Sequence, residues 1–255
     1  MADYIAHINA GVLAMVLAAM MVAAWGIGWL VGRRQRSRAG GEPSFTRDEA
    51  ILALLGLLLA FTFAMSLGKH DQRRIAAVSD SNAIGDFYTC ASLLEEPVRS
   101  QLRGLIREYA VLRYDLAERP PGRKALEKAL GRIQAMQDRL TELVAQAIKA
   151  GTPIAVPLTD TLNEVTSTNA SRLAAIGDRL PVTILVLLFV TALVCSILIG
   201  RQDGAKGRVQ VAATLSFIIL VSFVVYVTLD LNQPYHGFIK VSQDTLRRLI
   251  ASMGH

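Results

Sequence analysis

Two hydroxyl side chains and two bases lie at helical spacing in the first third of the chain. Thr62 and Ser66 are four residues apart, so in a helix both lie on one face. The same face continues through Lys69 and Arg73. Hydroxyl groups can replace part of the hydration shell of an ion, and rings of bases attract anions. The pattern therefore predicts a pathway for small anions, lined by hydroxyl groups and ending in a basic mouth.

The same four residues also have an interpretation that involves no transport. Thr and Ser in helices often return their hydroxyl groups to a carbonyl of the preceding turn or bond a neighbouring helix. Lys69 and Arg73 can anchor the helix at lipid headgroups. The apolar segments of the chain contain no carboxylate, which argues against a transporter driven by protons or cations. Both interpretations of the face stay open.

The sequence has no recognisable motif for catalysis or metal binding. Residues 200–207, GRQDGAKG, lack the spacing of a Walker loop and its Ser or Thr, and no nucleophile elbow, HExxH or EF-hand loop occurs. The four histidines have no ligand spacing, so no zinc site is expected. We predict a protein that is not an enzyme, with no metal and no cofactor.

Four long apolar segments must position these residues. They cover residues 8–31, 50–67, 181–200 and 209–229, and none contains a charged side chain. Each is close to the roughly 20 residues that a helix needs to cross a bilayer. Since backbone groups left unpaired in lipid are costly, such segments are predicted to be helices. The chain is thus expected to be an integral membrane protein with two transmembrane hairpins, in regions 1–68 and 180–229.

The charge distribution predicts an orientation for these spans. The chain is 52% hydrophobic with a net charge of +6, and much of the excess lies in two short loops between spans. The bases are Arg33, Arg34, Arg36, Arg38 and Arg47 in the first loop, and Arg201, Lys206 and Arg208 in the second. Bases in short loops mark the cytoplasmic side. Both termini and the polar region are therefore expected outside, and nucleic acid is not an expected partner.

The region between the hairpins, 69–179, has the apolar periodicity of amphipathic helices and no alternating strand pattern. The second span is expected to continue into this domain as one long helix. Further helices are predicted over residues 96–119, 124–149 and 158–180, separated by Pro and Gly. The tail, 230–255, carries a short amphipathic helix behind Ser242. The predicted fold class is all-α, with a 2 + 2 arrangement of spans around an extramembrane helical bundle.

Two pairs of residues predict contacts between helices. Gly28 and Gly32 form a small-xxx-small pair that lets another helix approach closely. Asn82 and Asn163 lie in amphipathic helices, where a buried amide is costly unless it is paired. Each Asn is expected to bond a neighbouring helix or a second subunit. The role predicted for all four residues is structural.

Three stretches resemble one protein family. They are residues 78–115, VSDSNAIGDFYTCASLLEEPVRSQLRGLIREYAVLRYD, residues 158–181, LTDTLNEVTSTNASRLAAIGDRLP, and residues 229–249, LDLNQPYHGFIKVSQDTLRRL. The shared elements are Asp80 to Gly85, Leu162 to Glu164, and Pro234 with Gly237. The chain resembles the bestrophin-like membrane proteins, a largely bacterial family, over nearly its whole length. The resemblance implies that the protein lies in the inner membrane of a bacterium.

The name of the family implies a relation to the bestrophins. Bestrophins are pentameric anion channels whose second span lines the pore. The resemblance thus implies a homo-oligomer, with a pentamer by analogy, and adds Phe61 to the pore-lining candidates. Bestrophins keep their termini and helical domain in the cytoplasm, opposite to the orientation that the basic loops predict. Our leading hypothesis is an oligomeric channel for small anions in a lipid bilayer. The alternative is a non-conducting, membrane-anchored sensor or scaffold whose helical domain binds a protein or envelope partner.

Overall fold

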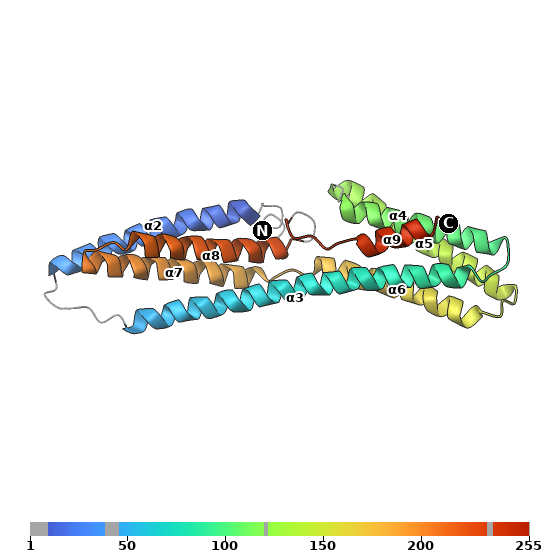
Figure 1. The fold of residues 1–255 in the computed structure, drawn as a ribbon, viewed down its shortest axis with the longest axis horizontal. Coiled ribbons are helices and arrows are strands. Elements are labelled where there is room, and N and C mark those ends of the chain that lie inside the picture. The colour runs from blue at the N-terminus through green and yellow to red at the C-terminus, as the bar shows by residue number, and fades with distance from the viewer. Residues whose placement is uncertain (1–9, 39–45, 120–121, 234–236, 255) are drawn as a thin grey trace. The chain divides into compact units, whose positions relative to one another are not determined.

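The computed structural model describes residues 10–38, 46–119, 122–233 and 237–254, and within them every regular element is a helix. The all-helical prediction is confirmed, while Pro234 lies outside the described residues. The helices are α2 Ala10–Arg38, α3 Thr46–Ala91, α4 Val98–Glu118, α5 Arg123–Lys149, α6 Ala155–Gly177, α7 Val182–Lys206, α8 Val211–Leu231 and α9 Asp244–Ser252 (Figure 1).

The chain divides into two compact units. We call Met1–His70 with Arg179–Ile239 the apolar unit, and Asp71–Asp178 with Lys240–His255 the polar unit. The boundary falls within α3, a single helix of 46 residues that begins in the apolar unit and ends in the polar unit. The tail helix α9 belongs to the polar unit, where Leu246 and Met253 are buried in its core.

Four helical stretches are long and apolar enough to cross a membrane. They are Ala10–Arg36, Glu49–Ala91, Ala155–Lys206 and Val211–Leu231. Each overlaps one of the apolar segments expected from the sequence. The last begins two residues later than expected, and residues 8 and 9 of the first segment lie outside the described residues. The third stretch combines α6 and α7, which are separate helices because the chain breaks before Pro181. Proline has no N–H to donate and favours the first turn of a new helix.

Glycines bring α2 and α7 together in the apolar unit. A Cβ atom at Gly28 would overlap the carbonyl oxygen of Ile197, and one at Gly32 would overlap that of Arg201. The contact is reciprocal, since a Cβ atom at Gly200 or at Gly204 would overlap backbone oxygens of α2. Because the contacts advance in the same direction along both helices, α2 and α7 are parallel and their backbones touch.

This contact also explains why α7 extends to Lys206, beyond the span end expected near residue 200. Gly204 packs against the backbone of α2 one turn past Gly200. Asp203 of α7 is buried beside this contact. Its Oδ2 accepts hydrogen bonds from Trp25 Nε1 of α2 at 3.1 Å and from Thr214 Oγ1 of α8 at 3.3 Å. A segment with the composition of a polar loop is therefore helical because tertiary contacts hold it.

The polar unit has its own core. Phe87 of α3, Ile106 and Tyr109 of α4, Leu140 of α5 and Leu158 of α6 are each 0% exposed. Within each helix buried residues recur at steps of three and four, as Leu102, Ile106 and Tyr109 do in α4. This spacing places apolar side chains on one face of a helix. The helices of this unit therefore pack as a bundle around a continuous apolar interior.

The glycine contact generates a paired prediction on α2. Gly28→Ala forces a methyl group onto the backbone of α7 and is expected to lower the free energy of unfolding by about 1–3 kcal/mol. Gly26→Ala is the matched control, because nothing lies within 4 Å of a Cβ atom there. Thermal unfolding in detergent micelles should show a lower midpoint for Gly28→Ala alone. Equal midpoints for the two variants would contradict the close contact.

Candidate functional site

The two hydroxyl groups of the predicted pathway point into the apolar unit. Thr62 is 2% exposed and its Oγ1 donates to the carbonyl of Leu58 at 2.8 Å. Ser66 is 0% exposed and its Oγ donates to the carbonyl of Thr228 on α8, also at 2.8 Å. Both donors are thus bound to backbone oxygens within one chain, and Ser66 connects α3 to α8.

The two bases lie in different surroundings. Lys69 is half-buried, whereas Arg73 is only 4% exposed. Arg73 Nε donates to the carbonyl of Ala175 at 3.2 Å, and Nη2 donates to that of Asp178 at 3.2 Å. These oxygens lie at the C-terminal end of α6, where a cation also interacts favourably with the helix dipole. Arg73 thus caps α6 within the polar unit.

Phe61 lies on a different face of α3, about 100° from Thr62 around the helix. Its side chain is 61% exposed, and Leu57 and Leu54, one and two turns earlier, are about half exposed. Of the four apolar segments, that of α3 is the least covered within the chain, with 17% buried against 28% or more for each of the others. The exposed face containing Leu54, Leu57 and Phe61 is therefore available to lipid or to a second subunit.

The predicted amide contacts are not formed within the chain. Asn82 and Asn163 are both exposed, so a bond to a second subunit stays a prediction for them. Asn169, 7% exposed, is a buried asparagine of α6, and its oxygen accepts from Arg113 Nη1. Asn169 follows Leu162 by two helical turns and Val165 by one, so it lies on the buried face of α6. This spacing is the sequence signal that could have identified it.

The most concentrated charge in the interior of the polar unit surrounds Asp80. This carboxylate is 0% exposed, and its Oδ2 accepts from Arg113 Nη2 and from Arg172 Nη1, each at 2.7 Å. The three residues come from α3, α4 and α6, and the guanidinium groups are nearly as buried as the acid. Breaking such a pair on one side is strongly destabilising because it leaves a charge unpaired in the interior. We call these three residues the Asp80 cluster.

Neutral groups complete the environment of the Asp80 cluster. Arg172 Nη2 donates to Gln243 Oε1 at 3.0 Å, and this glutamine directly precedes α9. The guanidinium carbon of Arg113 lies 5.8 Å from the centre of the Tyr109 ring, within the range of a cation–π contact. The cluster therefore connects α3, α4, α6 and the start of α9 around one carboxylate.

Tyr109 is the titratable neighbour of this cluster. Burial raises the pKa of its phenol from 10.0 to about 12, while the positive charge of Arg113 opposes that rise. Gln137 Nε2 donates to its oxygen at 3.4 Å. Tyr109 is thus a neutral hydrogen-bonding group at physiological pH.

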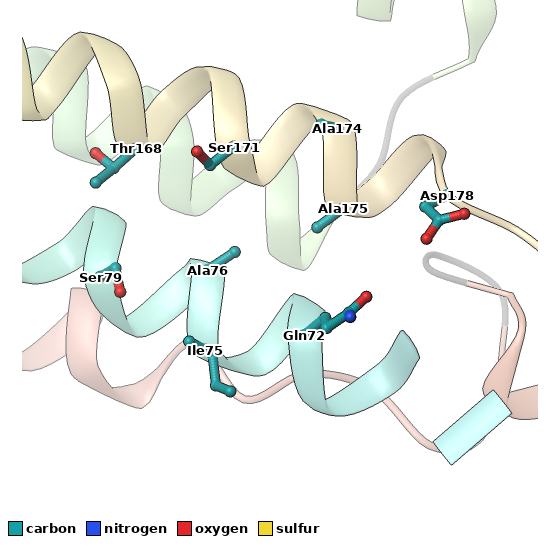
Figure 2. A pocket seen from close by; sticks show the side chains of 9 residues that line it. All are labelled: Gln72, Ile75, Ala76, Ser79, Thr168, Ser171, Ala174, Ala175 and Asp178. Atoms are coloured by element: carbon teal, nitrogen blue, oxygen red, sulfur yellow. The ribbon is translucent and has the colours of Figure 1, made fainter. Parts of the chain in front are cut away.

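A groove of about 750 Å³ runs between α3 and α6 in the polar unit. Figure 2 shows short side chains of the two helices facing each other across it. Its lining consists of Gln72, Ile75, Ala76, Ser79, Thr168, Ser171, Ala174, Ala175 and Asp178. No base or cysteine lines it, and in the part of the chain that the structure describes no three His, Cys, Asp or Glu residues are grouped to hold a metal.

Two glycines of the shared sequence elements, Gly85 and Gly237, lie at packing contacts. A Cβ atom at Gly85 would lie 3.2 Å from Leu249 Cδ1 of α9. A Cβ atom at Gly237 would lie 2.8 Å from the carbonyl oxygen of Asp230. The buried carboxylate of Asp230 accepts from the backbone N–H groups of Phe238 and Ile239, each at 2.9 Å, and so fixes the turn after α8.

Four helices long and apolar enough to span a bilayer, together with a polar helical unit, indicate a helical membrane protein. The family model for the Bestrophin-like domain matches residues 49–246. The chain therefore belongs to the Bestrophin-like family. A comparison of the sequence with curated proteins found no match.

Solved structures share the fold at low sequence identity. A crystal structure of a bacterial bestrophin homologue from Klebsiella pneumoniae, carrying a point mutation, matches with a TM-score of 0.67 at 10% identity. The match covers 95% of this chain and 98% of that one. A crystal structure of a membrane protein variant matches with a TM-score of 0.64 at 12% identity, covering 94% and 96% of the two chains.

The Asp80 cluster predicts a large effect from one atom change. Asp80→Asn keeps the size of the side chain but leaves two buried guanidinium groups without a counter-charge, so we expect a loss of about 3–5 kcal/mol in unfolding free energy. Asp86→Asn is the control, since Asp86 is exposed on the same helix and should change stability by less than about 0.5 kcal/mol. Denaturant unfolding in detergent measures both. Similar values for the two variants would contradict the role given to Asp80.

Tyr109 predicts a pH dependence at alkaline pH. Because its pKa is raised on folding, its contribution to stability is fully present below pH 10, the ordinary pKa, and is lost as the pH rises to about 12. The loss should reach roughly 2–3 kcal/mol, and it should be absent from Tyr109→Phe. The measurement is denaturant unfolding of both proteins over this pH range. Parallel curves would show that Tyr109 does not contribute.

Proposed function

We propose that the chain assembles into a homo-oligomer that conducts small ions across a bacterial inner membrane, with α3 next to the central axis. The observation that carries this proposal is the low coverage of α3, whose apolar segment is the least buried of the four within one chain. In the oligomer, neighbouring subunits cover this surface. Their α3 helices together enclose a path along the central axis. Five subunits are proposed by analogy with bestrophins.

Phe61 is the proposed pore-lining residue of the apolar unit. Its ring is exposed on α3 at the depth of the apolar segment, where a ring of such side chains narrows a pathway and gates it by dewetting. Thr62 and Ser66 lie behind it and hold α3 against the rest of the chain through carbonyl oxygens. In this proposal they support the pore wall, and Phe61 forms its surface.

The charges exposed along α3 bear on ion selectivity. Anion conduction was expected from Lys69 and Arg73, but Arg73 is buried against the end of α6. Lys69 is half-buried and Arg74 is exposed, and both are bases that favour anions. Asp71 and Asp86 are exposed on the same helix, and acidic rings favour cations. Small anions remain the first candidate, and the two aspartates make small cations a second one.

The arrangement of spans is also proposed. The parallel contact of α2 and α7 puts their C-terminal ends, which carry the basic loops, on the same side of the membrane. This supports two transmembrane hairpins of the same orientation, with the basic ends in the cytoplasm by the positive-inside rule. The polar unit and both termini are then outside.

Cysteine accessibility tests which residue faces the pore. We expect charged thiosulfonate reagents to lower the current of Phe61→Cys by more than about half, since the adduct narrows and charges the pathway. Ser66→Cys is the matched control and should not react, because position 66 is 0% exposed. The native cysteines, Cys90 and Cys195, are buried, so the unmodified chain should keep its current.

The protein would be purified, reconstituted in planar bilayers and recorded in a gradient of potassium chloride. The sign of the reversal potential then separates anion from cation conduction. Block of Ser66→Cys without block of Phe61→Cys would contradict the proposed pore face. Oligomers without any current would favour the non-conducting scaffold.

A further inference from the structure

One end of the apolar unit gathers basic side chains from two helices. The parallel contact places the last turns of α2 and α7 side by side (Figure 1). Thr214 at the start of α8 donates to Asp203 there. The bases described at this end are Arg33, Arg34, Arg36, Arg201, Lys206 and Arg208. We call these six residues the basic end.

The surface of the basic end is positive. Five of its six side chains are exposed, and Arg201 is half-buried. Asp203 lies between the same two helices, but it is 7% exposed and its carboxylate is engaged by Trp25 and Thr214. The acid therefore contributes to packing in the interior. Among the residues of α2 and of 200–208 whose exposure the structure describes, the exposed charges at this end are those of the bases.

Two contacts fix individual bases on this surface. The guanidinium carbon of Arg33 lies 5.5 Å from the centre of the Trp29 ring, within cation–π range. The guanidinium group of Arg36 packs against Gly207, where a Cβ atom would overlap it. Gly207 ends α7 with a φ of 66°, a left-handed conformation that glycine adopts without strain. Arg36 of α2 therefore lies directly over the C-terminal end of α7.

The tryptophans indicate the depth of this surface in a bilayer. Trp29 and Trp25 are half-buried one and two turns before Arg33, at the end of the apolar stretch of α2. Tryptophan is enriched where hydrocarbon meets the headgroups. The basic end thus stands at headgroup level, where phospholipids are its immediate neighbours.

We propose that the basic end binds the phosphate headgroups of anionic phospholipids. Five of its six bases are arginines, whose planar guanidinium groups match two phosphate oxygens at once. Each base near an anionic membrane surface strengthens attraction by about fivefold. The rings of Trp25 and Trp29 lie on the hydrocarbon side of the exposed bases. The rings match the acyl chains of a lipid, and the bases match its phosphate. This inference does not depend on whether the oligomer conducts.

Native mass spectrometry of the full-length protein in detergent tests the proposal. Phosphatidylglycerol and phosphatidylcholine are titrated separately, and the bound fraction of each is measured. We expect the parent chain to prefer phosphatidylglycerol, and Arg33→Gln with Arg36→Gln to lose about 25-fold of that preference. Arg132→Gln with Arg139→Gln, two exposed bases of the polar unit, is the matched control and should keep it.

Two further measurements make each outcome decisive. Arg33→Lys with Arg36→Lys preserves the charge but not the two-pronged guanidinium geometry, so it should lose less of the preference for phosphatidylglycerol than the glutamine pair does. It also serves as the test where the glutamine pair is too unstable to purify. Inorganic phosphate and glycerol phosphate are added as competitors, and neither should displace the lipid at matched concentration. The proposal is overturned by equal binding of the two lipids, by full retention in the glutamine pair, by a loss in the lysine pair as large as that in the glutamine pair, or by displacement with free phosphate.

Discussion

The polar unit depends on one carboxylate. Asp80 has no access to water and is the counter-charge for two guanidinium groups that arrive from α4 and α6. Apolar burial holds helices together without fixing their rotation or register, whereas a pair of 2.7 Å ion pairs has a narrow geometry. We infer that the cluster selects the register in which these helices pack, and that Arg172 extends this selection to the tail through Gln243.

The apolar unit reaches a fixed arrangement by different means. Lipid offers no hydrophobic driving force between spans, so close backbone contact and a few polar bonds must hold them. The glycines of α2 and α7 provide the contact, and Asp203 supplies bonds to α2 and α8 where the apolar segment ends. The hydroxyl group of Ser66 likewise bonds α3 to α8. The polar atoms of this unit thus serve its own packing first, and the function has to use the surfaces that remain.

The sequence predicted the helices well because their signals are local. Apolar length identified the four long helices, and periodicity with Pro and Gly identified those of the polar unit to within a few residues. The same reasoning grouped Thr62 and Ser66 on one face correctly, but helical periodicity does not tell which face looks inward. That depends on the carbonyl of Thr228, which is 162 residues away from Ser66. The Asp80 cluster escaped prediction for the same reason, since its three members are spread over α3, α4 and α6.

Three residues of the elements that carry the family resemblance have a physical role in the structure. Asp80 is the centre of the buried ion pairs, Gly85 makes room for Leu249, and Gly237 lies against the backbone of Asp230 at the turn after α8. Each of them fixes a contact between helices or a turn, and none lies on the exposed apolar face of α3. These contacts fix the packing of the helices and place no such constraint on the face of α3 that the proposed pore uses. Selectivity within the family is then expected to follow positions such as Phe61 and Asp71, which contribute little to the packing of a single chain.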